Sequence, residues 1–393
     1  MSAPVVIIGA GQAAAQAVTT LRAKGFNGPI VLFGDEPHPP YQRPPLSKAF
    51  LSAEMSADRL ELKGTHFYEQ HNVDLRLGTR VVRLDPRERK VELCGGEFVA
   101  YDKLLIATGA RTRRISLPGA ELQGVHSIRG IDDAQRLREA LRPGGRLVII
   151  GGGYIGLEVA AKARQLGVAV TVVESQERVL ARCVATPISE FLTAQHRAQG
   201  VDILTGAGVE AIESSVAAEA VRLVDGRRLD ADAVLIAVGA VPNQELAAAA
   251  GISSANGILV DAETRTAAPG IHAAGDVALF PSQRYGGQLI RLESVQNAID
   301  QAKAAAASML GEPAHYDPVP WFWSDQYDLK LQIAGLSNGH DRTELDGNPQ
   351  ERRFSLRYFR GNELIAVDSV NDPRSHMLAR RALAETPAAK AGS

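Results

Sequence analysis

The sequence predicts an α/β fold in which two similar halves precede a smaller α+β domain with an antiparallel sheet. Two observations predict the halves. A short β-branched run leads directly into a glycine-rich turn at residues 5–14, and the same arrangement recurs at residues 147–156. Such runs suit parallel strands that are buried on both faces. A third observation predicts the smaller domain, because the last 75 residues change to strands of alternating polarity.

The length and charge of the chain exclude several classes of protein. A chain of 393 residues suggests two or three domains and can bury a large core without disulfides or structural zinc. The balance of 43 Lys and Arg against 45 Asp and Glu argues against a nucleic-acid partner. No apolar run approaches the ~20 residues of a membrane span. The N-terminus also lacks the features of a signal peptide, so we expect a cytoplasmic protein.

The first glycine-rich turn carries a dinucleotide-binding pattern at Gly9, Gly11 and Ala14. Gly9 permits the tight turn, and Gly11 lets the backbone approach a pyrophosphate at a helix N-terminus. Asp35 or Glu36, 24 or 25 residues after Gly11, is placed to bind a ribose hydroxyl. A plain packing motif is the alternative, but the repeat disfavours it. The expected elements are strands at 5–8 and 30–33 and a helix at 12–24.

The second turn is a complete fingerprint at Gly151, Gly153 and Gly156. Glu174 follows 21 residues after Gly153, at the end of the next strand. A carboxylate there accepts hydrogen bonds from a free ribose diol and repels a 2′-phosphate, so it favours NADH over NADPH. Arg178 lies close by in the sequence, and its positive charge would weaken that preference for NADH. The expected elements are strands at 147–150 and 170–173 and a helix ending near residue 166.

Further elements complete both halves and the C-terminal domain. Each half ends in another buried strand, at 104–109 and 233–239, and a Gly275-Asp276 element follows late in the chain. The other expected elements are a hairpin at 89–100, a helix at 294–310, strands at 329–336, 354–360 and 364–370, a helix at 377–383 and a disordered tail at 384–393.

Two fingerprints imply two dinucleotides, and FAD with NADH is the usual pair. The first fingerprint is assigned to FAD, because Asp276 then returns to bond the ribityl chain; a helix-capping role is its alternative. The helix that begins near Ser294 is able to aim its N-terminus at the flavin. The predicted fold is thus two Rossmann-like domains in a glutathione-reductase-like arrangement. The domains are expected at 1–110 with 241–318 for FAD, 111–240 for NADH and 319–393 for the C-terminal interface.

Several segments together resemble one family, in order along nearly the whole chain. They are residues 41–48 (YQRPPLSK), 151–158 (GGGYIGLE), 291–298 (RLESVQNA), 320–327 (PWFWSDQY) and 366–371 (AVDSVN). This combination resembles the FAD-dependent NADH:ferredoxin reductases of the putidaredoxin reductase and aromatic-ring dioxygenase ferredoxin reductase type.

The resemblance implies roles at matching positions. Lys48 and Glu158 would be a catalytic pair beside the flavin and nicotinamide. Their alternatives are a solvated surface lysine and an acid that interacts with the helix dipole. The implied FAD contacts are Ala13, Asp35, Lys48, Val81, Arg129, Asp276 and Val295, with Arg43 close to the cofactor, and they join Gly9, Gly11 and Ala14 of the first fingerprint. The expected NAD contacts are Gly151, Gly153, Gly156 and Glu174 of the second fingerprint, together with Ile155 and Glu158 on the helix that follows.

The aromatic cluster at residues 321–327 holds both tryptophans, Trp321 and Trp323. Either is a candidate to contact FAD, and core packing between domains is the alternative. Residues 36–52 lack the cysteines that disulfide reductases and peroxidases of this fold need. Cys94 and Cys183 are therefore expected to be structural, and the scattered histidines predict no metal site.

The resulting hypothesis is a reductase that takes hydride from NADH and passes electrons singly to a [2Fe–2S] ferredoxin. That ferredoxin would serve a cytochrome P450 or a ring-hydroxylating dioxygenase. A basic run at Arg111, Arg113 and Arg114 would suit an acidic ferredoxin, although a solvated linker explains it equally well. The alternatives are an NADH oxidase and a flavoprotein resembling apoptosis-inducing factor.

Overall fold

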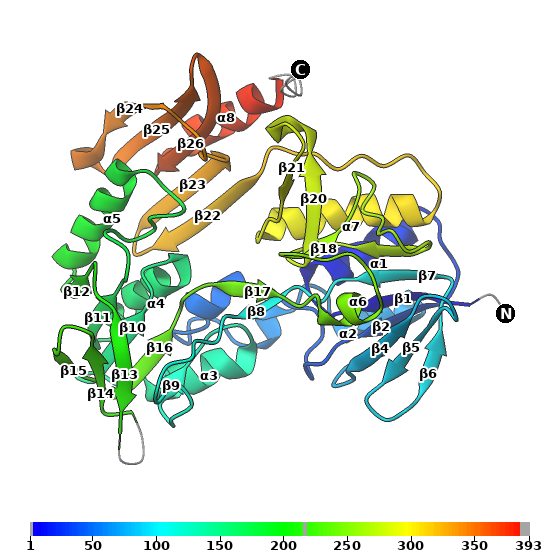
Figure 1. Cartoon of the computed structure of the whole chain (residues 1–393), viewed down its shortest axis with the longest axis horizontal. Coiled ribbons are helices and arrows are strands. Elements are labelled where there is room, and N and C mark those ends of the chain that lie inside the picture. The colour runs from blue at the N-terminus through cyan, green and yellow to red at the C-terminus, as the bar shows by residue number, and fades with distance from the viewer. Residues whose placement is uncertain (1–2, 215–217, 386–393) are drawn as a thin grey trace.

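The computed structural model describes residues 3–214 and 218–385 and has three sheet modules (Figure 1). The N-terminal module lies at the right of Figure 1, the central module at the lower left, and the C-terminal sheet above the central module. The fold is mixed α/β, as the sequence predicts. No helix among the described residues is long and apolar enough to cross a membrane.

The N-terminal module is built on a parallel sheet of order β19-β7-β1-β2-β3. All four residues of β1 are buried, with Val5 and Ile7 in one core cluster and Val6 and Ile8 in another. This confirms a strand that is covered on both faces. The elements are β1 (Val5–Ile8), α1 (Gln12–Ala23), β2 (Ile30–Phe33), α2 (Thr65–Gln70), β3 (Val73–Arg76), β7 (Lys103–Ile106), β19 (Ile271–Ala273) and α7 (Val295–Met309).

The central module repeats this plan in a parallel sheet of order β12-β11-β10-β16-β9. Leu147 and Ile149 of β10 enter one core cluster, whereas Val148 and Ile150 enter another. The repeated β-α-β unit predicted from the sequence is confirmed. The elements are β9 (Val125–His126), α3 (Ile131–Ala140), β10 (Arg146–Ile150), α4 (Tyr154–Gln165), β11 (Ala169–Val173), α5 (Thr186–Ala198), β12 (Val201–Leu204) and β16 (Ala233–Ile236).

Smaller sheets accompany the two modules. Each parallel sheet has a three-stranded antiparallel companion, and the expected hairpin around Gly95 and Gly96 belongs to the first of these. The strands β8 and β17 pair with each other and carry the chain between the modules. The remaining elements before residue 311 are β4 (Val81–Asp85), β5 (Lys90–Leu93), β6 (Phe98–Ala100), β8 (Ala110–Thr112), β13 (Val209–Glu213), β14 (Ala220–Leu223), β15 (Arg228–Asp230), β17 (Ala240–Pro242), α6 (Glu245–Ala249), β18 (Ile258–Leu259), β20 (Ala278–Ser282) and β21 (Gln288–Ile290), with short 3₁₀ helices η1 (Pro44–Ser47), η2 (Asp58–Leu60) and η3 (Gln283–Tyr285).

The C-terminal module is a five-stranded antiparallel sheet of order β22-β23-β26-β25-β24 that packs against α8. The core between this sheet and the central module continues to residues near η1. The elements are β22 (Trp321–Gln326), β23 (Leu329–Gly335), β24 (Arg342–Asn348), η4 (Pro349–Glu351), β25 (Arg353–Arg360), β26 (Glu363–Val370) and α8 (Pro373–Glu385).

The structure corrects the prediction in three places within this module. Strands β22 and β24 were not expected. Helix α8 is longer than the predicted 377–383, because Asp372 accepts hydrogen bonds from the amide and hydroxyl of Ser375 and Pro373 occupies the first turn. Ala384 and Glu385 of the predicted disordered tail are helical. The remainder of that tail, 386–393, lies outside the described residues.

Candidate active site

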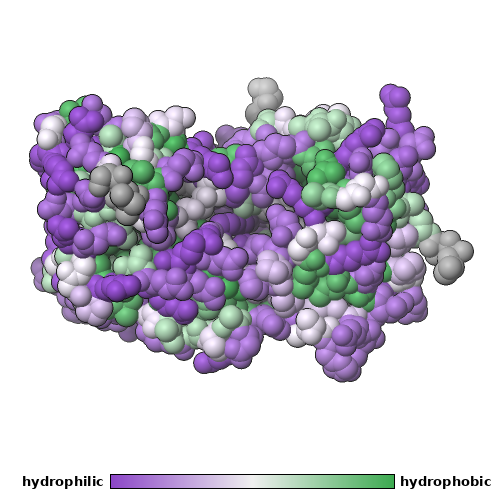
Figure 2. All heavy atoms as spheres, turned by 90° about the horizontal axis from the view of Figure 1, so that it is seen from below, coloured by the Kyte–Doolittle hydropathy of each residue, from purple (hydrophilic) through white to green (hydrophobic). Residues whose placement is uncertain are grey.

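One elongated cavity reaches all three modules. It begins at the turn after β1, passes the N-terminal ends of α1 and α7, and ends between α4 and β22. Figure 2 shows the molecular surface hollowed between its two ends, with hydrophilic residues around the hollow. The cavity therefore offers an extended ligand one continuous site at the carboxyl ends of the first sheet.

The first glycine turn forms the inner end of this cavity. Gly9 has φ +104°, and a Cβ there would lie within 3.0 Å of the Ala107 carbonyl, so only glycine fits. Gly11 faces open space, and α1 begins directly after it with no side-chain cap. Exposed backbone N–H groups at a helix N-terminus fit an anionic pyrophosphate. Ala13 also lines the cavity, whereas Ala14 is fully buried behind it.

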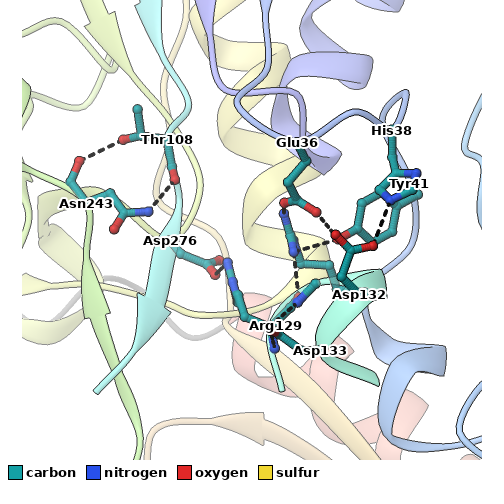
Figure 3. A network of polar contacts seen from close by, with 11 residues as sticks. Glu36, His38, Tyr41, Thr108, Arg129, Asp132, Asp133, Asn243 and Asp276 are labelled. Atoms are coloured by element: carbon teal, nitrogen blue, oxygen red, sulfur yellow. Dashed lines mark hydrogen bonds and ion pairs between the residues drawn. The ribbon is translucent and has the colours of Figure 1, made fainter. Parts of the chain in front are cut away.

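The two acidic residues after β2, Asp35 and Glu36, have different surroundings. Asp35 is exposed at the cavity edge. The oxygens of Glu36 accept hydrogen bonds from Arg43 at 2.5 Å and from the Tyr41 hydroxyl at 2.6 Å (Figure 3). Burial alone would raise the pKa of Glu36, but the charge of Arg43 and the two hydrogen bonds hold it below its usual value. Glu36 thus fixes Arg43, and Asp35 faces the cavity.

A second ion pair lies beside this cluster, because the Arg129 carbonyl accepts a hydrogen bond from Arg43 at 2.5 Å. The Arg129 guanidinium lies 3.0 Å from the carboxylate of Asp276, which follows Gly275 after β19 (Figure 3). Both residues line the cavity, as does Val295 at the start of α7. The Ser294 hydroxyl caps α7 by accepting a hydrogen bond from the Asn297 amide. Segments far apart in the sequence therefore converge on one wall.

Lys48 and Glu158 form a buried ion pair at the far end of the cavity. The Lys48 ammonium lies 2.7 Å from Glu158 Oε2, and their side chains are only 17% and 5% exposed. Lys48 is therefore not a solvated surface lysine. The hydroxyls of Ser47 and Ser324 donate to the two Glu158 oxygens at 2.5 and 2.6 Å. A buried charge pair is expensive unless such hydrogen bonds accompany it.

Aromatic residues close the same end. Trp323, Phe322 and Tyr154 line the cavity, and the last two have ring centroids 4.7 Å apart. Trp321 does not line the cavity. It lies between Trp323 and α8, with the Arg380 guanidinium 4.5 Å from its ring centroid.

The second glycine turn has the same construction as the first, outside the cavity lining. A Cβ at Gly151 would clash with the Ala237 carbonyl, and one at Gly156 would clash with the Gly151 carbonyl. Gly153 faces open space. Glu174 accepts a hydrogen bond from the Gly152 amide at 2.7 Å, so its carboxylate lies at this turn. From the helix that follows, Ile155 and Glu158 reach the main cavity.

The remaining predicted residues lie elsewhere. Val81 is a core residue at the start of β4 and does not line the cavity. Of the basic run, Arg111 lines the cavity and pairs with Glu245 at 2.7 Å, and Arg113 and Arg114 are exposed. Cys94 and Cys183 are exposed and form no disulfide, and Cys183 has a side-chain hydrogen bond with Tyr154. Over residues 3–214 and 218–385, no group of three acidic, histidine or cysteine side chains is arranged to bind a metal.

Sequence reasoning missed several residues of the site. Thr108 and Asn243 exchange two hydrogen bonds, of 2.8 and 2.9 Å, where β7 and β17 meet the cavity (Figure 3). Ser47 and Ser324 were also missed, although both lie inside motifs that carry the family resemblance. No local spacing in the sequence indicates these contacts, because each joins residues that are more than 100 positions apart.

Comparison with known proteins identifies similar chains. Residues 3–305 match the family profile described as pyridine nucleotide-disulphide oxidoreductase, and residues 321–392 match the reductase C-terminal profile. Rhodocoxin reductase of Rhodococcus erythropolis is 45% identical over 381 residues, which are 97% of this chain and 89% of that protein. The ferredoxin–NAD(+) reductase component of the biphenyl dioxygenase system of Paraburkholderia xenovorans is 40% identical over 96% of this chain and 92% of its own. The covalent putidaredoxin reductase–putidaredoxin complex superposes with a TM-score of 0.95 at 40% identity, covering 98% of this chain and 93% of that chain.

Proposed function

This chain belongs to the pyridine nucleotide-disulphide oxidoreductase family, among its ferredoxin reductases, and from that premise we propose that it is an FAD-dependent NADH:ferredoxin oxidoreductase. It takes a hydride from NADH and delivers electrons one at a time to a [2Fe–2S] ferredoxin. That ferredoxin serves a cytochrome P450 or an aromatic-ring dioxygenase. Residues 36–52 contain no cysteine, so the chain lacks the dithiol that a disulfide reductase uses at this position.

The observation that carries this proposal is the single cavity that joins the first glycine turn to the Lys48–Glu158 pair. FAD, when bound, supplies the conversion of a two-electron donor into single electrons. The open backbone at Gly11 fits its pyrophosphate, and Trp323 lies at the opposite end, where a flat ring would be covered. The residues we assign to hold FAD at the cavity surface are Gly9, Gly11, Ala13, Asp35, Arg43, Lys48, Arg129, Asp276, Val295 and Trp323, with Ala14, Val81 and Trp321 packed behind them.

The second glycine turn is assigned to NADH. Gly153 leaves space for the pyrophosphate, and Glu174 beside it is placed to bind a ribose diol. Ile155 and Glu158 lie on the same helix at the main cavity, so a nicotinamide bound there would meet the Lys48–Glu158 pair. In this assignment residues 1–110 and 241–318 form the FAD domain, 111–240 the NADH domain and 319–393 the interface domain.

A cytoplasmic location is part of the proposal. Cys94 and Cys183 are exposed and carry no disulfide, which suits a reducing compartment. NADH and ferredoxin are also available there as electron donor and acceptor.

The test is an anaerobic titration of the purified protein, run in parallel with NADH and NADPH. We expect about one equivalent of NADH to bleach a flavin band near 450 nm, and NADPH to act slowly. Addition of an oxidised [2Fe–2S] ferredoxin should then restore the band as the ferredoxin is reduced.

Three other outcomes would overturn this proposal. A flavin that NADH does not reduce excludes a reductase. Rapid oxygen consumption without ferredoxin indicates an NADH oxidase. Slow bleaching with a persistent charge-transfer band, NADH-dependent dimerisation and poor ferredoxin reduction indicates a protein similar to apoptosis-inducing factor.

A further inference from the structure

A chain of buried hydrogen bonds leads away from the cavity toward the C-terminal sheet. Ser324 donates to Glu158 Oε1 at 2.6 Å, and the Gln326 amide donates to the Ser324 hydroxyl at 3.2 Å. Gln326 Oε1 lies 2.9 Å from His196 Nε2, and the Tyr327 hydroxyl lies 3.3 Å from His196 Nδ1. The chain therefore connects an interface between α5 and β22 to the acid of the cavity.

All four hydrogen bonds of this chain point the same way. The Gln326 oxygen can only accept, so His196 Nε2 carries the proton and Nδ1 is left to accept from Tyr327. Burial lowers the pKa of His196, which keeps the ring in this neutral form. Each group thus donates toward Glu158. Hydrogen bonds aligned in one direction polarise one another, so the last bond, to the carboxylate, is strengthened.

The chain crosses the boundaries between modules. His196 lies on α5 of the central module, whereas Ser324 and Gln326 lie on β22 of the C-terminal sheet. All three side chains are at most 1% exposed, and Glu158 on α4 is 4% exposed. Buried polar groups at such a contact cost free energy unless every one is hydrogen-bonded. Apolar side chains would stabilise the interface without that requirement. The arrangement instead supplies Glu158 with a donor on the side opposite Lys48.

We propose that Ser324, Gln326 and His196 are positioning residues that fix the Glu158 carboxylate and, through it, the Lys48 ammonium at the cavity. The inference rests on the proposed function, in which this pair meets the flavin and the nicotinamide. The chain fixes geometry and does not conduct protons, because the Gln326 amide would have to change tautomer to pass a proton on. Loss of a link should loosen the ion pair without emptying the cavity.

The direct test measures the Lys48 amine by labelling the purified protein with acetic anhydride and quantifying the Lys48 peptide by mass spectrometry. In Ser324→Ala we expect Lys48 acetylation to rise about fivefold, because its carboxylate partner loses a charge-assisted hydrogen bond. The rate of flavin bleaching by NADH should fall about tenfold with little change in KM, since the pair acts at the reacting end of the cavity. Ser369→Ala is the matched control, because Ser369 is a fully buried serine of the same sheet whose hydroxyl has no partner among the described residues.

A pair of substitutions at His196 tests the hydrogen-bond chain at a residue that does not contact Glu158. This test is valid even if Ser324→Ala fails to fold. His196→Gln can place an N–H donor near the original Nε2, whereas the shorter His196→Asn cannot reach Gln326. We expect the Gln variant to retain wild-type Lys48 labelling and the Asn variant to raise it. Equal labelling in both variants, or unchanged labelling in a folded Ser324→Ala, overturns the inference. Labelling reports on the chain even if NADH fails to reduce the flavin, so the two proposals fail separately.

Discussion

At the residue scale, the carboxylate of Glu174 at the second glycine turn is the group that we propose to select NADH over NADPH. Glu174 accepts hydrogen bonds from the backbone amides of Gly152 and Gln176, at 2.7 and 2.8 Å, so its negative charge is fixed at the turn that we assign to the adenosine ribose. A 2′-phosphate would be repelled there. A neutral residue of the same shape should therefore separate the effect of charge from that of shape.

We expect Glu174→Gln to reduce the preference for NADH over NADPH, measured as the ratio of kcat/KM values, by about tenfold or more, equivalent to ~1.4 kcal/mol. The glutamine keeps the size but only one of the two acceptor oxygens, so one backbone hydrogen bond is lost and the thermal midpoint should fall slightly, by the equivalent of about 1 kcal/mol. Glu177→Gln is the control, because this nearby acid is exposed. An unchanged ratio would show that Glu174 does not face the adenosine ribose.

Asp368 links protonation to the stability of the C-terminal sheet. Burial raises the pKa of this carboxyl from 3.8 to about 7, and its partner is the Tyr358 hydroxyl, which also accepts a hydrogen bond from the Ala185 amide of the central module. Folding thus favours the protonated acid. The contribution of Asp368 to the free energy of unfolding is therefore complete below pH 4. It is lost as the pH rises through 7, and the free energy of unfolding falls by at most about 1.4 kcal/mol per pH unit.

Asp368→Asn should remove this pH dependence, because the amide is neutral at every pH. Thermal midpoints measured from pH 5 to 8 should decline with pH in the wild type and less steeply in the variant. Asp346→Asn serves as the control, since Asp346 pairs with Arg357 at 2.5 Å at an exposed site. Parallel profiles for the wild type and Asp368→Asn would contradict the assignment.

At the element scale, the two glycines of the turn between β1 and α1 have different roles: Gly9 is needed for the fold, and Gly11 is expected to be needed for FAD binding. Gly9→Ala places a methyl group against the Ala107 carbonyl at a positive φ and should destabilise the fold by about 2 kcal/mol or more. Gly11→Ala meets no atom within 4 Å at φ −109°, so with FAD removed its thermal midpoint should match that of the FAD-free wild type. Its FAD content should nevertheless fall severalfold, because the methyl group fills the approach to the pyrophosphate.

Thermal melting and the ratio of absorbance at about 450 nm to that at 280 nm measure the two effects separately. Gly25→Ala is a comparison for strain alone, since Gly25 has φ +82° with open space around it and lies away from the cavity. Normal FAD content in Gly11→Ala would count against the first turn as the pyrophosphate site.

Elements with a strong local pattern could be predicted from the sequence, and those without one could not. The β-branched runs at β1 and β10 are buried on alternating sides, so composition alone indicated them. Strand β24 is an exposed edge strand with a single large apolar residue, Leu345, and carries no such pattern. The hydrogen bonds of Ser324 and Asn243 exist only once distant segments meet, so no spacing in the sequence indicates them.

At the scale of the whole molecule, one core cluster joins the central module to the C-terminal sheet and extends to the segment around η1, whereas the N-terminal sheet has two clusters of its own. The same buried cluster contains Phe50 beside η1, Leu157 on α4, Ile188 on α5 and Leu331 on β23. The cavity and the Lys48–Glu158 pair lie next to this shared core, so the site is assembled only when all modules are packed together. We therefore expect the central module and the C-terminal sheet to unfold together, and the N-terminal module to follow through its η1 segment, even though the chain is long enough for independent domains.

Urea unfolding followed by two probes tests this cooperativity. Both tryptophans lie on β22, so their fluorescence reports the C-terminal sheet, whereas far-ultraviolet circular dichroism reports the whole chain. We expect the two midpoints to coincide. Leu331→Ala, which truncates a side chain 1% exposed, should lower both midpoints together by removing about 2–5 kcal/mol of stability. If only the fluorescence midpoint moved, the C-terminal sheet would unfold separately, and Ser324 would then leave Glu158 while the nucleotide-binding modules remained folded.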